Sequence, residues 1–333
     1  MMRVRLEWYD AAGIALAGAF AAWTVISGAT RPGNPWPQLA LLAAAAAAYV
    51  IGRLRGGRRP VFVPAAVVVS ILVGTVASGP AALSGGPLAP PLGYGNANGA
   101  MFTLGVASAC AVSVLANKEP VRLVAGGLAV IFVGLAISTL SKTAAVLAIG
   151  ILVIGVVARR LGRWFVAVAP LAVVATLTVT VVLGLNHGTL PSLFEELSAR
   201  RTVLWRDAME IIADEPVLGA GPGMFARTSP TALADADARW AHSAYLQVGA
   251  ETGVIGAALL GLLLLWVFGA LYRSRQDVRL IVLGTAAVSA FAVHAAIDYV
   301  AHFPAVVIVA ALLAGLSSSR KPLPAGNDTG PQP

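Results

Sequence analysis

Long runs of apolar residues recur along most of the chain and predict membrane-spanning helices. A span needs roughly 20 apolar residues, within a range of about 17–25. Backbone groups in lipid must pair internally, so each span is expected to be helical. We expect ten spans, at about 11–29, 36–52, 61–78, 98–116, 121–140, 143–158, 164–185, 254–272, 280–297 and 299–316. The second and sixth are short, which flanking residues that snorkel can accommodate.

The basic residues between these runs indicate the orientation of the chain. Lys and Arg are enriched in short cytoplasmic loops. With the N-terminus in the cytoplasm, the cytoplasmic segments hold 16 of the 23 basic residues and the external segments hold 7. Every internal cytoplasmic loop then carries at least two positive charges. The pattern predicts that both termini are cytoplasmic.

Composition agrees with a membrane protein and changes the interpretation of the net charge. Hydrophobic residues make up 58% of the 333 residues and charged residues 11%, whereas soluble domains average about 25% charged residues. The net charge of +8 follows from the cytoplasmic basic loops, so no nucleic-acid partner is expected. The single cysteine, Cys110, lies in an apolar run and excludes an intrachain disulfide.

The predicted domain organisation is a single membrane domain, residues 1–316, interrupted by one long external segment, 186–253. Five of the seven external basic residues and eight acidic residues lie in its part 186–241. A loop of this length in a compact domain usually has a function. The tail from 317 to 333 is polar and rich in Pro and Gly, which is typical of disorder.

An amphipathic helix is expected within the long segment, over RRTVLWRDAMEIIAD. Leu204, Ala208, Ile211 and Ile212 fall at helical spacing on one face. The helix should end near Glu215, because a residue that precedes proline disfavours helical backbone. Its arginines allow two interpretations, namely anion binding or surface ion pairs with Glu195, Glu196 and Asp207.

The next stretch, VLGAGPGMF, contains Gly219, Gly221 and Gly223. No strand precedes it and no βαβ unit surrounds it, so it is not a dinucleotide-binding signature. Two interpretations remain open: a tight turn that returns the chain to the membrane, or a nest of backbone N–H groups that binds an anion.

The stretch AHSAYLQVGAETG, residues 241–253, concentrates polar groups at the start of a predicted span, where such groups are costly. A short helix is expected here, ending at Gly253. Histidine can accept a proton from a hydroxyl near neutral pH. Arginine binds phosphate oxygens through two parallel hydrogen bonds. His242 together with the arginine-bearing helix therefore suits a phosphorylated lipid substrate.

The order of these motifs resembles the O-antigen ligase and O-antigen polymerase superfamily of bacterial membrane glycosyltransferases. The resemblance rests on Arg-x3-Trp, on PVLGAGPGMF and on His-Ser-x-Tyr-Leu-Gln followed by Glu-x-Gly. Weaker similarities occur in GYGNANGAMF (93–102), LSKTAAVLAIG (140–150) and HAAIDYVAHFPA (294–305). Lys142 stands where the family pattern has arginine, which keeps the charge but loses the planar fork.

The resemblance implies an all-α polytopic protein of the bacterial cytoplasmic membrane, with its active site facing outward. It implies transfer of a glycan from a polyprenyl-diphosphate donor to a hydroxyl on a glycan, lipid or cell-wall acceptor, with inversion and without a metal or cofactor. His242 is the expected base. Arg201 is the main expected diphosphate ligand, with Lys142 and the rival Arg200. The expected supporting residues are Trp205, Tyr245, Gln247, Glu251, Gly221, Gly223 and Asn98.

Several alternatives stay open. His294, Asp298 and His302 share one face if their helix continues, as a metal or proton site would need; the nearby Pro304 favours a re-entrant turn or interhelical hydrogen bonds instead. Asn96 and Asn98 either contact sugar or cap the following helix, and capping is favoured. A transporter or flippase without chemistry is the alternative function, although its charges should lie at mid-membrane.

Overall fold

The computed structural model describes residues 8–57, 60–83, 89–185, 192–235 and 237–319, with backbone only for 83 and 192–199. The described residues form helices and no strands. The helices that come before the long segment are α1 Trp8–Thr30, α2 Trp36–Gly56, α3 Phe62–Ser78, the 3-10 turn η1 Gly79–Leu83, α4 Gly95–Leu115, α5 Glu119–Ser138, α6 Lys142–Leu161 and α7 Trp164–Leu185. The later helices are α8 Ser192–Asp214, α9 Phe225–Thr228, α10 Pro230–Ala234, α11 Ala244–Tyr272, α12 Val278–Ile297, the 3-10 turn η2 Val300–His302 and α13 Pro304–Ser317.

Within the described residues, nine helices are long and apolar enough to cross a membrane, namely α1 to α7, α11 and α12. The protein is therefore an all-α polytopic membrane protein, as predicted. The tenth expected span, 299–316, instead contains η2 and the 14-residue helix α13. Pro304 starts α13, because proline fits the first turn of a helix but not its interior. From residue 320 on, the predicted disordered tail lies outside the described residues.

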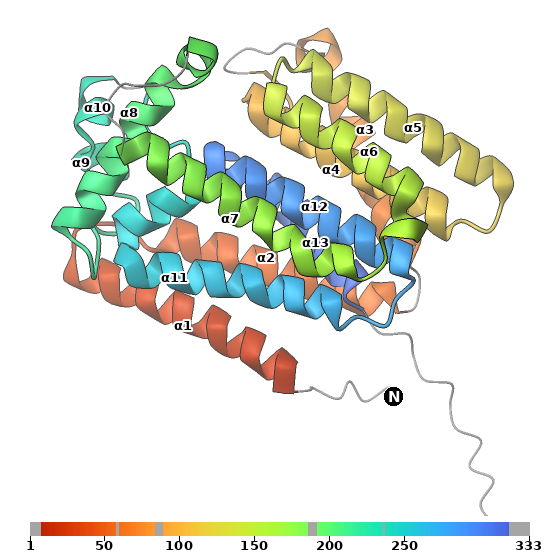
Figure 1. Cartoon of the computed structure of the whole chain (residues 1–333), viewed down its shortest axis with the longest axis horizontal. Coiled ribbons are helices and arrows are strands. Elements are labelled where there is room, and N and C mark those ends of the chain that lie inside the picture. The colour runs from red at the N-terminus through yellow and green to blue at the C-terminus, as the bar shows by residue number, and fades with distance from the viewer. Residues whose placement is uncertain (1–7, 58–59, 84–88, 186–191, 236, 320–333) are drawn as a thin grey trace, which may run out of the picture.

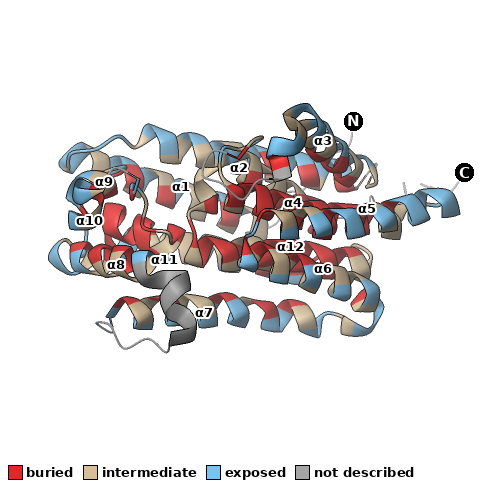
Figure 2. Cartoon of the chain, turned by 90° about the horizontal axis from the view of Figure 1, so that it is seen from above, coloured by how far each residue is buried: buried red, intermediate tan, exposed pale blue. Residues whose placement is uncertain are grey.

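Two helices form the centre of the bundle. In the most apolar windows of α4 and α12, 83% and 78% of the residues are buried, against at most 28% in the other spans. Figure 2 shows this as nearly continuous burial along both helices. Small residues allow the close packing; a Cβ at Gly99 of α4 would lie 2.6 Å from the Cβ of Ala144 on α6. The outer helices expose apolar side chains, as contact with lipid requires.

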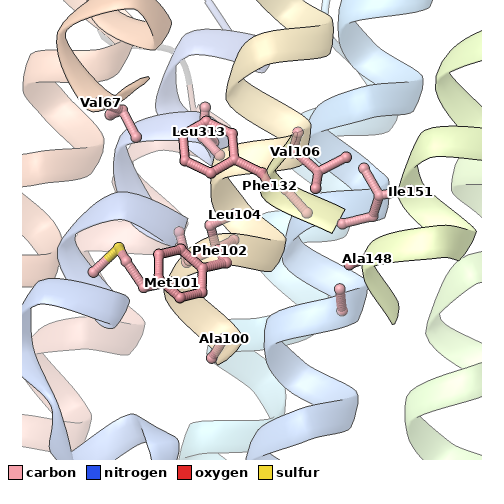
Figure 3. Packing of buried hydrophobic residues seen from close by; sticks show 14 of the residues in the cluster. Val67, Ala100, Met101, Phe102, Leu104, Val106, Phe132, Ala148, Ile151 and Leu313 are labelled. Atoms are coloured by element: carbon pink, nitrogen blue, oxygen red, sulfur yellow. The ribbon is translucent and has the colours of Figure 1, made fainter. Parts of the chain in front are cut away.

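The apolar core lies around α4. Phe102 and Leu104 of α4 pack with Phe132 of α5 and Ile151 of α6 (Figure 3). A second close contact joins α2 to α13, where a Cβ on Gly315 would lie 2.0 Å from the carbonyl oxygen of Tyr49. The short C-terminal helix is therefore anchored inside the bundle.

The long segment forms a layer at one end of the bundle. Helices α8, α9 and α10 gather there, away from the N-terminus (Figure 1). Helix α8 contains the amphipathic stretch predicted above and ends at Asp214. Leu204, Trp205, Ala208 and Ile211 are buried in one cluster with Phe225. This packing fixes which side of α8 faces the rest of the protein.

Candidate active site

Asp298 is the centre of a polar cluster at this end of the bundle. It ends α12 with extended backbone (φ −154°, ψ 166°), and its side chain is 1% exposed. Its carboxylate accepts hydrogen bonds from Arg201 Nη2 at 2.7 Å, Asn96 Nδ2 at 2.6 Å and the Tyr299 backbone N at 2.7 Å. The Tyr94 hydroxyl lies 3.1 Å from both carboxylate oxygens. The cluster therefore joins α4, α8 and the turn that follows α12.

His242 lies beside this carboxylate, with its Nδ1 3.9 Å from Asp298 Oδ2. The side chain of His242 is 17% exposed. The backbone of His242 has φ +50°, which is uncommon for a residue with a Cβ. Trp205 Nε1 donates to the carbonyl of His242 at 3.1 Å, and Ser243 caps α11 by accepting from Leu246 N. These contacts fix the backbone on which the imidazole of His242 is placed.

The electrostatics of the cluster keep Asp298 ionised. Burial raises the pKa of a carboxyl group, but the neighbouring His242 and Arg201 outweigh burial and lower the pKa of Asp298 below its ordinary value. Burial and the Asp298 charge both raise the pKa of Tyr94, so its hydroxyl remains a donor at neutral pH. A buried negative charge therefore orients one arginine and one histidine.

The structure separates the two rival arginines. Arg201 faces Asp298 and is 25% exposed, whereas Arg200 pairs with Asp235, and both of those side chains are about half exposed. Arg206 lies 3.7 Å from Glu210 on the outer side of α8. The expected surface pairing with Asp207 is wrong, because Asp207 is buried and accepts from Ser229 and the Thr231 N–H.

Lys142 lies outside this cluster. It is the first residue of α6 and is exposed. Its helix end packs near Gly99, in the first turns of α4, close in sequence to Asn96. Within the described part of the chain, Lys142 makes no hydrogen bond or ion pair with the groups around Asp298. Its role as a phosphate ligand stays a prediction.

Gln247 and Glu251 form a second polar cluster on the first part of α11. Glu251 is 2% exposed and accepts hydrogen bonds from Gln247 Nε2 at 3.0 Å and Gln38 Nε2 at 2.6 Å. The oxygen of the Gln247 amide accepts from the backbone N of Ala241 at 3.1 Å. The cluster therefore supports the backbone next to His242.

The glycine-rich stretch also meets Glu251. The backbone N–H groups of Gly223 and Phe225 donate to its carboxylate. Gly219, Gly221 and Gly223 all have positive φ, and a Cβ at Gly221 would lie 1.8 Å from the Pro32 carbonyl oxygen. The stretch is therefore a tight turn, and two of its N–H groups meet a buried carboxyl group of the same chain. The anion-binding interpretation stays a hypothesis.

The remaining expected residues hold the backbone around the cluster. The Tyr245 hydroxyl donates to the Ala292 carbonyl on α12 at 3.3 Å. The prediction that Asn96 and Asn98 cap a helix is wrong, because α4 begins at Gly95 and its N-cap residue, Tyr94, makes no side-chain capping bond. Asn98 is buried and binds the carbonyls of Ala89 and Pro90 at 2.9 Å. Asn96 instead donates to Asp298.

Sequence reasoning considered Asp298 only for a metal or proton site with His294 and His302 and did not connect it to Arg201 and His242, and it missed Tyr94 and Tyr299. Helix α12 ends at Ile297, so His294, Asp298 and His302 do not share one helical face. The turn η2 agrees with the alternative favoured from Pro304, a turn of the chain at this point. One feature of the sequence could have pointed to Asp298: it is a lone acidic residue at the edge of an apolar span. His187, which the sequence suggests is an ordinary residue of the long segment, lies outside the described residues.

The comparisons with known proteins found one family. A family model described as O-antigen ligase matches residues 127–261. The match covers α8, the glycine-rich stretch and His242, but neither Tyr94 nor Asp298. The search of curated proteins found no match. Residues 127–261 of this membrane protein are thus similar to the O-antigen ligase family, in agreement with the resemblance in the sequence motifs.

Proposed function

We propose that this protein transfers a glycan from a polyprenyl-diphosphate donor to an acceptor hydroxyl at the outer face of the bacterial cytoplasmic membrane. The observation that carries the proposal is the meeting of Arg201 and His242 at the buried Asp298. These residues come from α8, from the loop before α11 and from the end of α12. A base and a phosphate-binding cation in one place are what such a transfer needs.

The reaction balances with these groups alone. The acceptor oxygen bonds to the anomeric carbon of the donor sugar, and the bond from that carbon to the phosphate oxygen breaks. The bonding electron pair leaves with the polyprenyl diphosphate, and the hydroxyl proton passes to His242. Attack from the side opposite the leaving group inverts the anomeric configuration. No step requires a metal ion, so the proposal includes metal-independent chemistry.

His242 is proposed as the general base, acting through Nε2. Its Nδ1 faces the Asp298 carboxylate, and a negative charge there favours a proton on Nδ1. Nε2 then has a free lone pair for the acceptor hydroxyl. General base catalysis typically contributes about 10²–10⁴-fold to the rate.

Arg201 is proposed as the diphosphate ligand. One of its N–H groups binds Asp298, and the guanidinium has five N–H donors in total. The others remain for phosphate oxygens on the exposed side. A fixed cation there stabilises the charge that develops on the leaving group.

The direct test is release of polyprenyl diphosphate by the purified protein in nanodiscs, with a panel of lipid-linked oligosaccharides as donors. We expect release by the wild type and a loss of about 10²-fold or more in His242→Ala, with no change when EDTA is added. A ladder of product sizes would indicate a polymerase and a single addition a ligase. Equal release by both proteins would exclude His242 as the base. Transport of the donors without release would favour a flippase.

A further inference from the structure

A group of aromatic side chains surrounds the polar cluster and has no role in the steps above. We call Trp240, Tyr299 and His302 the aromatic ledge. Trp240 lies two residues before His242, and the other two follow Asp298. The ring centroids of Trp240 and His302 are 4.0 Å apart, and those of Trp240 and Tyr299 are 6.3 Å apart with an interplanar angle of 25°. All three residues are partly exposed.

The ledge is rigid and uncharged at neutral pH. Burial lowers the pKa of His302 to about 4, so this imidazole is neutral at pH 7. Tyr299 is held on its other side by Tyr94, whose ring stacks against it at 4.5 Å. Packing on several sides fixes the ring planes before any ligand binds, which lowers the entropic cost of binding.

The ledge also adjoins the proposed base. The ring of Tyr299 meets the His242 ring edge to face at 4.7 Å. Tyr299 stacks with both Tyr94 and Trp240, whereas no ring contact joins Tyr94 to Trp240 in the described part of the chain. Tyr299 thus links Trp240 to the ring of Tyr94, whose hydroxyl meets the Asp298 carboxylate. A group stacked on Trp240 would therefore lie next to Tyr299, which contacts the proposed base.

The chemistry of the ledge favours a sugar ring as its occupant. A pyranose has an apolar C–H face, which stacks on an indole, and a rim of hydroxyls, which needs polar neighbours. The ledge lies in the layer that also holds Arg200, Asp235 and Arg239, rather than on an apolar side of the bundle. An isoprenoid chain would instead follow the apolar helix faces.

From this geometry we infer that Trp240, backed by Tyr299 and His302, is the floor of a subsite that stacks a pyranose ring of the acceptor beside His242. The inference rests on the proposed function and narrows it, because it makes the acceptor a carbohydrate. The hydroxyl that attacks would belong to the stacked ring or to its neighbour. A peptide or a simple lipid alcohol would leave the ledge unused.

The kinetic test separates acceptor binding from donor binding. Trp240→Ala is compared with Trp240→Phe, which keeps an aromatic face, and with Trp36→Ala, which removes an exposed tryptophan from the start of α2. We expect Trp240→Ala to raise the KM for a glycan acceptor about tenfold, with the KM for the donor changed less than twofold. The acceptor KM of Trp240→Phe should stay within about threefold of the wild-type value. The acceptor KM of Trp36→Ala should equal that of the wild type.

An equal rise in donor KM, an unchanged acceptor KM, or faster transfer to peptides than to glycans would overturn the inference. Binding can also be measured without catalysis, by saturation-transfer NMR with gluco-, galacto- and manno-configured hexasaccharides and no donor. A wild-type signal that Trp240→Ala removes supports the ledge even if no diphosphate is ever released. No signal from any of the three sugars at millimolar concentration would overturn it.

Discussion

Arg200 and Arg201 are adjacent in the sequence but have different partners in the fold. Consecutive residues on a helix point about 100° apart, since a turn takes 3.6 residues. The buried side of α8 turns Arg201 toward Asp298 and leaves Arg200 at the surface with Asp235. The two residues therefore form a matched pair for testing phosphate binding.

We predict that Arg201→Ala lowers kcat/KM for the lipid-linked donor about 10²–10³-fold, as expected when a group that stabilises transition-state charge is lost. Arg200→Ala should change it less than about threefold, because an exposed ion pair contributes only about 0–1 kcal/mol. Arg201→Lys should recover part of the loss, since it keeps the charge without the fork. Similar losses from both alanine variants would show that the arginines share the role.

Asp298 leads to a prediction about pH. Its pKa is lowered in the folded protein, so the stabilisation that it provides is present above its unfolded pKa of about 4. That stabilisation is lost as the pH falls through the lower, folded value. We expect the melting temperature of wild type in detergent to fall more between pH 6 and pH 3 than that of Asp298→Asn.

Other carboxyl groups titrate in both proteins, so only the difference between the two curves reports on Asp298. Identical pH dependence would mean that the Arg201 and His242 contacts contribute no stability. In the transfer assay, Asp298→Asn should lower kcat by about 10²-fold through misplacement of His242. The donor KM should rise as well, because Arg201 also loses its charged partner.

At the scale of elements, the kink in α11 connects the membrane span to the site. Gly253 has φ +71° and ψ −178° and separates a short helix from the span. This agrees with the expectation that a short helix ends at Gly253. The glycine-rich stretch packs into the kink, where a Cβ at Gly253 would lie 2.0 Å from the Val217 carbonyl oxygen. The short helix carries Gln247 and Glu251 and leads directly from His242.

Glycines at this junction should tolerate no side chain. Gly221→Ala would place a Cβ 1.8 Å from the Pro32 carbonyl oxygen at φ +109°, and we expect it to destabilise the protein by about 1–3 kcal/mol. The control is Gly126→Ala on α5, where a Cβ meets open space. That change should be neutral or stabilising by about 0.4–1 kcal/mol. Thermal unfolding in detergent measures both, and equal melting temperatures would contradict this account of the junction.

At the scale of the whole molecule, the orientation of the bundle decides which compartment the site faces. The distribution of basic residues predicts that the loop between α6 and α7 is cytoplasmic and that the layer of α8 to α10 is external. Arg160, at the end of α6, and Thr228, in α9, are both exposed, and each marks one of the two sides. A membrane-impermeant maleimide should label Thr228→Cys in intact cells but label Arg160→Cys only after lysis.

Cys110 is buried and is replaced by serine in both variants as the common background. The opposite labelling pattern would place the site in the cytoplasm. That result would contradict a reaction at the outer face and would leave the arrangement of Arg201, His242 and Asp298 unchanged.

The fold class and part of the site were predictable from the sequence. Apolar runs determine which segments enter a membrane, because each buried backbone group must pair within its own helix. Helical periodicity likewise predicted the buried face of α8. His242 and Arg201 were predictable because they occur in local motifs of fixed spacing, which one sequence displays directly.

Only the tertiary structure decided how distant residues meet. Asp298 follows an ordinary apolar helix, and nothing in its local sequence shows that Arg201, 97 positions earlier, donates to it. Glu251 resembles a pocket residue in the sequence, yet the fold places it among the N–H groups of the glycine-rich stretch. Side-chain period and span length are local properties of the chain. Helix rotation, kinks and the partners of buried charges follow from packing among segments. This packing determined that Arg201 rather than Arg200 faces Asp298.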